Sequence, residues 1–360
     1  MEKVLIYPFD ENAIIYIKHQ KQLINMEIIS LVSPKGWGLK GEEYSFNEKK
    51  FIVESDFMKC LNDCTAVWFI DTLLDLDFDY ILKKILISVK KGKKIFYTRK
   101  STYSEIEIIK KHVEFKFLYL EKIEDKYGEK YLENRTYNIN VPVIFVAGES
   151  ENTGKFDLQL SLKEEFTSRG YDVSLVASRQ ESRFWKMNSV PKYMLEHNLS
   201  ERDKVIKFNH YIKDIEINEN PELIIIGLPG GYLNLSRKLI WDFGILYYEI
   251  GNSVKPDCII LNLFYDNYDK ESLTLINDEV KAVLGEDVDF FNITNRQLEV
   301  FESERDDVFT YLTLEEEFIN NKILNINVKE VYQLNQKTEI VRIVENIIKK
   351  LSEYSYIKTI

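Results

Sequence analysis

The sequence predicts an α/β protein with two doubly wound, mainly parallel-sheet domains, an N-terminal Rossmann-like domain and a C-terminal P-loop NTPase-like domain. First, short continuous runs of β-branched and aromatic residues alternate with segments of helical spacing along the 360 residues, as in parallel sheets. Second, a polar, tyrosine-rich stretch at 121–140 indicates a linker. Third, a loop with two glycines and a lysine follows the next apolar run. We therefore expect domains at 1–120 and 141–360, each long enough for its own core.

The N-terminal domain is expected to alternate strands with helices. Because its apolar runs are continuous rather than alternating, its sheet should be parallel and covered on both faces. The expected strands are Lys3–Tyr7, Glu27–Val32, Ala66–Ile70, Lys94–Tyr97 and a less apolar fifth at Phe115–Leu120, and the expected helices are Ile14–Leu23, Phe78–Val89 and Tyr103–His112.

One segment at a strand end of this domain is a candidate substrate loop. Ligands of such sheets bind beyond the carboxyl ends of the strands, and Lys35, Gly36, Trp37 and Gly38 follow the second strand. Two glycines around an aromatic residue, next to a lysine, suit a loop that covers a ligand or grips a peptide. The alternative is an ordinary surface loop with Trp37 packed onto the sheet.

The C-terminal domain repeats the alternation, apart from an irregular stretch at 181–200. Ser200 should cap one of its helices, with Asp203 at the capping-box position. The expected strands are Val143–Val146, Asp172–Ala177, Leu223–Ile226, Asp257–Leu263 and Val288–Ile293, and the expected helices are 153–168, Ser200–Asp214, 237–250, Leu273–Leu284 and Lys337–Leu351.

The loop between the first strand and helix of this domain has the layout of a phosphate-binding loop. It reads GESENTGK, from Gly148 to Lys155. Glycines let backbone N–H groups approach an anion, the helix N-terminus adds its dipole, and the lysine adds a charge. We expect Gly148, Asn152, Thr153, Gly154 and Lys155 to bind a nucleotide or another anion, with ATP and GTP as the candidate cofactors.

The loop also departs from the common P-loop pattern. Five residues separate its glycines instead of four, a spacing that resembles the variant loop of the dethiobiotin synthetase group, and Phe156 stands where Ser or Thr holds Mg²⁺. Glu149 and Glu151 place carboxylates where phosphates would lie. Three interpretations therefore stay open: an anion or nucleotide site, an ATP-hydrolysing site, and a structural βα turn with an incidental lysine. Mg²⁺ has no conventional ligand here.

Four further strand ends border the same expected crevice. Pro229, Gly230 and Gly231 follow a strand that lacks the acidic residue of a Walker B motif, and their turn could aim N–H groups at an anion or be a plain tight turn. Arg179 could pair with a phosphate or carboxylate. Asn262 and the segment 292–295 could read a base edge, although turn capping is the favoured interpretation.

No metal or hydrolase site is expected. Cys60 and Cys64 are spaced CxxxC with no histidine to complete a zinc set, and Cys258 lies in an apolar run, so all three read as structural thiols. The histidines, His19, His112, His197 and His210, show neither metal spacing nor a nucleophile partner.

The sequence resembles a known family along nearly its whole length. GESENTGKFDLQLSLKEEF, RGYDVSLVASR, SPKGWGLKGEE, LPGGYL, KPDCIILNLFYDN and NITN resemble the peptide maturation system proteins of clostridial gene clusters. The resemblance implies a role in making a ribosomally synthesised, modified peptide (RiPP biosynthesis), with a short cysteine-rich precursor peptide and a radical SAM maturase as partners. It supplies no reaction. The leading hypothesis is an accessory protein of this maturation that binds a nucleotide or another anion at the loop, and any reaction it has would be a ligase-like or kinase-like activation of a carboxylate. A non-catalytic scaffold with a relic P-loop, and a group-transfer enzyme using a pantetheine or nucleotide cofactor, remain alternatives.

The net charge and the lengths of the apolar segments restrict the partners and the cellular compartment that we expect. A net charge of −11 argues against nucleic acid and anionic membranes as general partners. We see no signal peptide, and no apolar run approaches the roughly 20 residues that span a bilayer. A cytoplasmic protein with reduced thiols is therefore expected. The oligomeric state is not predicted.

Overall fold

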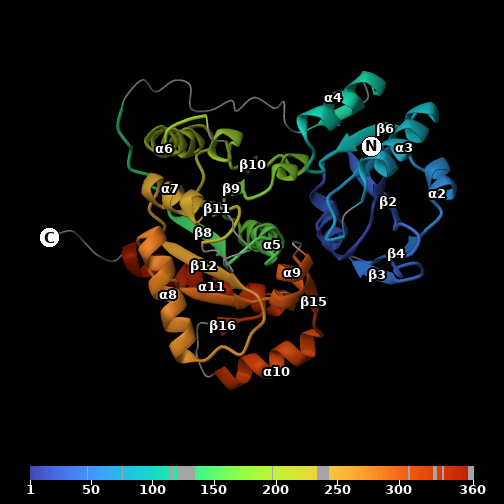
Figure 1. The fold of residues 1–360 in the computed structure, drawn as a ribbon. Coiled ribbons are helices and arrows are strands. Elements are labelled where there is room, and N and C mark those ends of the chain that lie inside the picture. The colour runs from blue at the N-terminus through green and yellow to red at the C-terminus, as the bar shows by residue number, and fades with distance from the viewer. Residues whose placement is uncertain are drawn as a thin grey trace. The chain divides into compact units, whose positions relative to one another are not determined.

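The computed structural model describes residues 1–46, 48–74, 76–113, 117–119, 134–196, 198–232, 243–306, 309–326, 331–334 and 336–355. The chain forms two compact units (Figure 1): unit 1 is Met1–Glu124 with Arg183–Lys186, and unit 2 is Asp125–Ser182 with Met187–Ile360. Each unit holds one mainly parallel sheet with helices, which confirms the predicted fold class. Most of the predicted linker, residues 121–133, lies outside the described residues.

Unit 1 is built on a seven-stranded sheet in the order β3-β4-β2-β1-β5-β6-β7. All neighbouring strands are parallel except the β3–β4 hairpin. The strands are β1 (Glu2–Tyr7), β2 (Met26–Val32), β3 (Glu43–Phe46), β4 (Lys49–Glu54), β5 (Ala66–Phe69), β6 (Lys94–Tyr97) and β7 (Phe117–Tyr119), and the helices are α1 (Ile14–Lys18), α2 (Phe57–Asp63), α3 (Phe78–Lys90) and α4 (Tyr103–His112).

Unit 1 differs from the sequence prediction in two places. The helix expected over Ile14–Leu23 ends at Lys18, because His19 leaves the helical conformation and a 3₁₀ turn, Gln20–Gln22, follows. The β3–β4 hairpin and α2 were not predicted. The hairpin strands alternate exposed residues with partly or fully buried ones, so they lack the continuous apolar runs from which the other strands were recognised.

The core of unit 1 includes residues far away in sequence. Phe184 packs edge-on against Trp68, with ring centroids 4.7 Å apart. The Trp185 indole Nε1 donates to the carbonyl of His19 at 3.0 Å, and the amide of Ile24 donates to the carbonyl of Phe184 at 3.0 Å. The stretch 181–200, which looked irregular in sequence, thus supplies two aromatic core residues to unit 1.

Unit 2 is built on a parallel seven-stranded sheet in the order β10-β9-β11-β8-β12-β13-β16, with a separate β14–β15 hairpin. The strands are β8 (Val143–Gly148), β9 (Val173–Ala177), β10 (Asn188–Ser189), β11 (Leu223–Gly227), β12 (Cys258–Leu263), β13 (Phe290–Ile293), β14 (Arg296–Leu298), β15 (Tyr311–Thr313) and β16 (Val331–Tyr332). The helices are α5 (Lys155–Ser168), α6 (Glu201–Glu219), α7 (Ile245–Ser253), α8 (Lys270–Leu284), α9 (Val300–Asp306), α10 (Glu316–Ile326) and α11 (Lys337–Ser355).

Both faces of this sheet are covered. Helices α6, α7 and α8 pack in series (Figure 1), and their buried residues share one core with alternate sheet residues such as Phe145, Ile226 and Leu261. Helix α5 packs against α11 and against β8, β9 and β11. The strand order places β8 between β11 and β12, so the chain segment that leaves β8 starts from the middle of the sheet.

The predicted elements of unit 2 form, with shifted ends. Ser200 caps α6 by accepting from the amide of Asp203, as predicted, but the helix continues to Glu219. The helix expected at 237–250 is α7, Ile245–Ser253, and residues 233–242 lie outside the described part. The short elements β10, β14, β15, β16, α9 and α10 were not predicted, because three-residue strands and polar helices carry too little apolar periodicity. No helix among the described residues has the length and apolarity to cross a bilayer.

Candidate functional site

The segment Gly148–Lys155 connects β8 to α5 at the carboxyl edge of the unit 2 sheet. Gly154 caps α5 with φ 73°, in the left-handed region that favours glycine. Asn152 is also left-handed, with φ 60°. The backbone N–H groups of Thr153 and Gly154 donate to no acceptor in the described part of the chain. The predicted loop therefore forms, and it presents amides at a helix N-terminus, where an anion is favoured.

Lys155 is buried, with 6% of its surface exposed. Its Nζ donates to the carbonyl of Ser150 at 2.6 Å and to the carbonyl of Gly230. Burial lowers the pKa of Lys155 to about 7; the charge of Arg179 lowers it too, while Glu151 and Glu149 oppose the shift. No carboxylate in the described part of the chain forms an ion pair with this ammonium. Its charge is thus hydrogen-bonded but not neutralised.

The Pro229–Gly231 turn forms a wall of the same site. A Cβ on Gly231 would lie 2.2 Å from the carbonyl oxygen of Glu149, so only glycine allows this close approach of the two backbones. The sequence left open whether this turn aims N–H groups at an anion or is a plain tight turn. In the structure the carbonyl of Gly230 accepts from Lys155.

Arg179 brings a second cation to the loop. Its guanidinium carbon lies 5.7 Å from the centroid of the Phe156 ring, a cation–π contact. Phe156, which replaces the Walker hydroxyl, is buried with 2% of its surface exposed. The charge of Arg179 also lowers the pKa of Lys155, and the loop amides, Lys155 and Arg179 all favour negative charge.

Two buried hydroxyls beside the loop lack partners. Ser150 Oγ and Thr294 Oγ1 are buried, and neither has a hydrogen-bond partner in the described part of the chain. The Thr294 Cγ2 atom lies 3.8 Å from where a Cβ on Gly154 would stand. Buried hydroxyls in folded proteins are almost always paired, so these two are uncommon features of the loop's surroundings. Neither hydroxyl was predicted from the sequence as a phosphate contact.

Other residues hold the loop in place. Asn262 Nδ2 donates to the carbonyl of Thr153 at 2.8 Å, and Arg296 Nη1 donates to the carbonyl of Asn152 at 3.1 Å. Asn292 Oδ1 accepts from the amide of Leu334 at 2.9 Å. Asn262 and Asn292 therefore support the backbone, in line with the favoured turn-capping interpretation. Arg296 was not predicted, since nothing in the sequence marks a supporting residue on a three-residue strand.

Glu149 lies at the start of the loop. The hydroxyl of Tyr268 donates to Glu149 Oε2 at 3.3 Å. Burial raises the pKa of Glu149 to about 7, against the hydrogen bonds from Phe264 and Tyr268, with a further rise from the charge of Asp266. Near neutral pH this carboxyl is therefore partly protonated, which reduces its repulsion of a phosphate. No group of three or more His, Cys, Asp or Glu able to hold a metal occurs among the described residues.

The other candidate residues lie elsewhere. Lys35–Gly38 belong to unit 1, where the amide of Trp37 donates to the carbonyl of Pro34 at 3.4 Å and the Trp37 side chain is half-buried. Both Gly36 and Gly38 have positive φ, at 97° and 82°. The three cysteines are free and buried. His19 and His210 are buried, His112 is exposed, and His197 lies outside the described residues.

The two parallel α/β units and the P-loop-like βα junction define the structural class of this protein. Comparison with solved structures shows which known fold it is similar to. No protein-family model matches the chain, and no curated protein matches its sequence. Its fold is similar to that of a DUF1611 family protein from Anabaena variabilis, with a TM-score of 0.63 and 8% identity, covering 97% of this chain and 100% of that one. At this identity the likeness shows the fold alone.

Two further solved structures are more distant. The signal recognition particle receptor FtsY from Elizabethkingia anophelis gives a TM-score of 0.32 and 15% identity over 80% of this chain and 91% of that one. The cell division protein ftsY from Thermotoga maritima gives 0.30 and 14% over 80% and 93%. Their TM-scores are too low to carry an argument about function.

Proposed function

We propose that unit 2 binds a phosphate-bearing ligand, with ATP and GTP as the first candidates, in the loop Gly148–Lys155. The observation that carries the proposal is the buried Lys155 ammonium, whose hydrogen-bond partners among the described residues are two carbonyl oxygens. A buried cation without a counter-ion costs several kcal/mol. An anion that enters the loop removes part of that cost, so the folded protein favours its binding.

The phosphate contacts follow from the positions of the groups. Lys155 would exchange the carbonyl of Gly230 for a phosphate oxygen, while Asn152, Thr153 and Gly154 donate from the backbone. Arg179, beside Phe156, would add a charged contact from the end of β9. Gly148 and the Pro229–Gly231 turn would keep side chains away from the ligand.

Binding is better supported than phosphoryl transfer. Phe156 offers no hydroxyl to Mg²⁺, and β11 ends at Gly227 rather than at a carboxylate. Ligase-like or kinase-like activation of a carboxylate therefore needs metal ligands of an unusual kind. On the family resemblance, we place this activity in the maturation of a ribosomally made peptide, with the precursor peptide and the radical SAM maturase as partners.

A second candidate is a non-catalytic scaffold with a relic loop. The observation that favours it is that Lys155 already has two carbonyl partners, beside a buried Phe156. Under this alternative the protein presents the precursor peptide to the maturase, and neither the binding nor the presentation of the peptide requires nucleotide.

Calorimetric titration of the full chain with ATP and GTP, with and without Mg²⁺, tests the first proposal. Lys155→Met should abolish saturable binding. Lys163→Met is the matched control, because Lys163 lies on the same helix and also donates to a carbonyl, that of Val173 at 2.6 Å. Equal affinity in the wild type and Lys155→Met would remove the phosphate-loop proposal.

Titration with the precursor peptide in the absence of nucleotide separates the scaffold from the nucleotide-dependent protein. The scaffold predicts micromolar peptide binding that Lys155→Met leaves unchanged. Absence of peptide binding at micromolar concentrations, with nucleotide binding intact, would reject it.

A further inference from the structure

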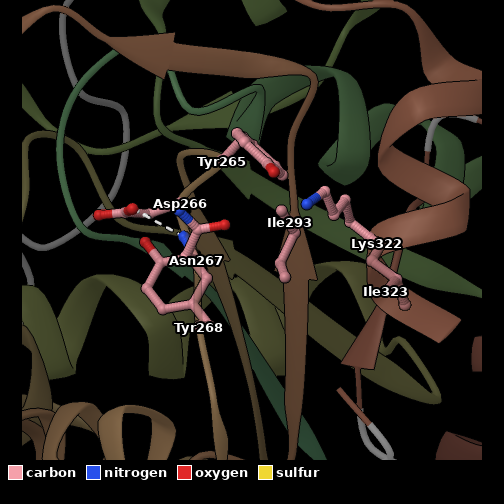
Figure 2. Close-up of a pocket in the computed structure, with 7 residues that line it drawn as sticks. All are labelled: Tyr265, Asp266, Asn267, Tyr268, Ile293, Lys322 and Ile323. Carbon is pink, nitrogen blue, oxygen red and sulfur yellow. Dashed lines mark hydrogen bonds between the residues drawn. The ribbon is translucent and has the colours of Figure 1, made fainter. Parts of the chain in front are cut away.

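The strand ends on the two sides of β8 give the phosphate loop different surroundings. Beyond β12 and β13, on one side, lies a cavity of about 210 Å³ with Tyr265, Tyr268 and Ile293 in its wall (Figure 2). At the end of β11, on the other side, lies the fully buried side chain of Gln159 from α5. A Cβ on Gly227, the last residue of β11, would lie 2.1 Å from the amide nitrogen of Gln159. A larger residue at this strand end would therefore displace the amide.

The Gln159 amide holds the chain that leaves β9. Its Oε1 accepts from the backbone N–H of Ser178 at 3.0 Å, and its Nε2 donates to the Ser178 hydroxyl at 3.0 Å. The ladder between β9 and β11 ends at the pair Val176–Ile226, so within the described residues no backbone partner on β11 holds Ser178. A buried amide is costly unless its polar groups are paired. Gln159 therefore takes the place of β11 as the partner of this chain segment.

Arg179 follows Ser178 directly and is held from its other side as well. The next residue, Gln180, donates from Nε2 to the carbonyl of Val190 at 2.7 Å. The backbone before and after Arg179 is thus fixed by side-chain hydrogen bonds, and the guanidinium lies over the ring of Phe156. The position of this cation is therefore set by its neighbours.

Gln159 and Phe156 lie on the same side of α5. They are three residues apart, a spacing that places side chains on one helix face. The same helix begins with Lys155, and the charge of Arg179 lowers the pKa of that lysine. Helix α5 thus supplies the lysine of the phosphate loop and two contacts to the segment that carries Arg179.

We propose that Gln159 is a positioning residue that keeps Arg179 at the phosphate loop. It acts through the backbone of Ser178, and Gly227 leaves room for its amide. This role also accounts for the glycine at the end of β11, where a Walker B motif has an acidic residue, because a longer side chain would occupy the position of the amide. The placement of Arg179 near Lys155 is independent of any ligand, and only its use in anion binding rests on the proposed function.

The pKa of Lys155 in the ligand-free full chain is the readout, because a role confined to packing would leave it unchanged. Lysine labelled with ¹³C at Cε lets NMR follow this titration, and Lys155→Met identifies the signal. Gln159→Met keeps the length of the side chain and removes both hydrogen bonds, so it should raise the pKa in the direction that Arg179→Gln does. The double variant should give the same pKa as Arg179→Gln alone, since both changes act through one guanidinium.

Two further variants guard against a general loss of structure. Gly227→Ala places a methyl group where the Gln159 amide lies and should also raise the pKa of Lys155. Lys163→Met is the matched control, because Lys163 ties the same helix to the opposite end of β9 through the carbonyl of Val173 at 2.6 Å. It lies roughly 12 Å from Lys155 along the helix, which exceeds the Debye length of about 8 Å at physiological salt. It should leave the pKa unchanged.

Sulfate titration separates this proposal from the proposed function. Where the wild type binds sulfate, Gln159→Met should weaken binding a fewfold, and the double variant should bind as Arg179→Gln does. If the wild type binds no sulfate, the proposed function fails, and the titration of Lys155 still decides the positioning role. An unchanged Lys155 pKa in folded Gln159→Met and Gly227→Ala would overturn that role. A pKa in the double variant above that of Arg179→Gln would overturn it too.

Discussion

Among the described residues of unit 2, two lysines are buried, and their charges are accommodated differently. Lys204 on α6 donates to Glu249 Oε1 on α7 at 3.2 Å, with side-chain exposures of 5% and 1%. Lys155, equally buried, donates to the carbonyls of Ser150 and Gly230 and to no carboxylate in the described part of the chain. The Lys204 ammonium is therefore paired with a carboxylate between two helices, whereas the Lys155 ammonium, at the sheet edge, is held by neutral carbonyl groups.

The comparison shows which of the two buried ammonium groups would gain free energy from an anionic partner. In a buried ion pair each charge is already balanced by its partner, so neither ion gains free energy from a further counter-ion. An ammonium held by neutral carbonyls remains unstable relative to one paired with an anion. Lys204 therefore reads as a structural residue that fixes α6 to α7, and Lys155 as the residue to which the proposed function assigns the binding charge. Mutations, pH and neighbouring charges test this contrast.

The largest effect is expected for Lys204→Met. The change leaves Glu249 as a buried, uncompensated carboxylate, so the free energy of unfolding should fall by about 3–5 kcal/mol. Urea unfolding followed by circular dichroism measures it. The double variant with Glu249→Leu should recover most of the loss, since it removes both charges. A loss below about 1 kcal/mol for the single variant would show that the Lys204–Glu249 pair does not stabilise the packing of α6 against α7.

Lys155→Met should act on stability with the opposite sign. At pH 6, below the pKa of about 7 that burial gives Lys155, the folded protein carries a desolvated cation, and removing it should raise the free energy of unfolding by about 1 kcal/mol. Between pH 7 and the unfolded value of 10.5, the unfolded chain binds more protons than the folded one. The wild type therefore gains stability as pH rises through this window.

Urea unfolding of the wild type and Lys155→Met at pH 6, 7.5 and 9 checks this prediction. The stabilising effect of the variant should be largest at pH 6 and shrink as pH rises. A destabilised variant at pH 6 would mean that the two carbonyl hydrogen bonds outweigh the burial of charge, and Lys155 would then be a structural lysine like Lys204.

Anion binding should take up a proton. A bound anion favours the charged form of Lys155, so its pKa rises on binding, and affinity falls by about tenfold per pH unit above 7 until the bound-state pKa is reached. Sulfate is the suitable probe, because it does not titrate in this range. Calorimetry in buffers of different ionisation enthalpy counts the protons directly.

Glu149 contributes with the same sign. Its pKa is raised to about 7, so it becomes negative over the same range and repels the anion. Glu149→Gln separates the two groups: it should leave proton uptake in place but reduce its size. No proton uptake in the wild type at pH 8 would contradict the assignment of the binding charge to Lys155.

Much of this site was predictable from the sequence, because it depends on local order along the chain. Glycines, a lysine and a helix start within eight residues of each other place Gly148–Lys155 on one loop whatever the rest does. The turn Pro229–Gly231 and Arg179 were expected nearby, since the carboxyl ends of parallel strands meet at one edge.

The rest depends on packing that the sequence does not show. Thr294 reaches Gly154 across the sheet edge, and Arg296 reaches Asn152 from a three-residue strand; neither has a periodic pattern. The inward carbonyl of Gly230 is a backbone orientation that the letters PGG leave undetermined. Likewise, Phe184 and Trp185 contribute to the core of unit 1 from a stretch without regular spacing.

The smallest effect is expected for Arg179→Gln. This change tests whether the charge that sets Lys155 apart from Lys204 is shared with Arg179. The charge of Arg179 lowers the pKa of Lys155, so its removal should shift the pH midpoint of sulfate binding upward. Sulfate affinity at pH 6.5 should fall only a fewfold, about 1 kcal/mol, because the guanidinium is partly exposed and Lys155 remains charged there. Sulfate titrations from pH 6 to 9 measure both quantities. An unchanged midpoint with weaker binding would make Arg179 a separate phosphate contact, electrostatically independent of Lys155, whereas an upward shift shows that the two cations share one site.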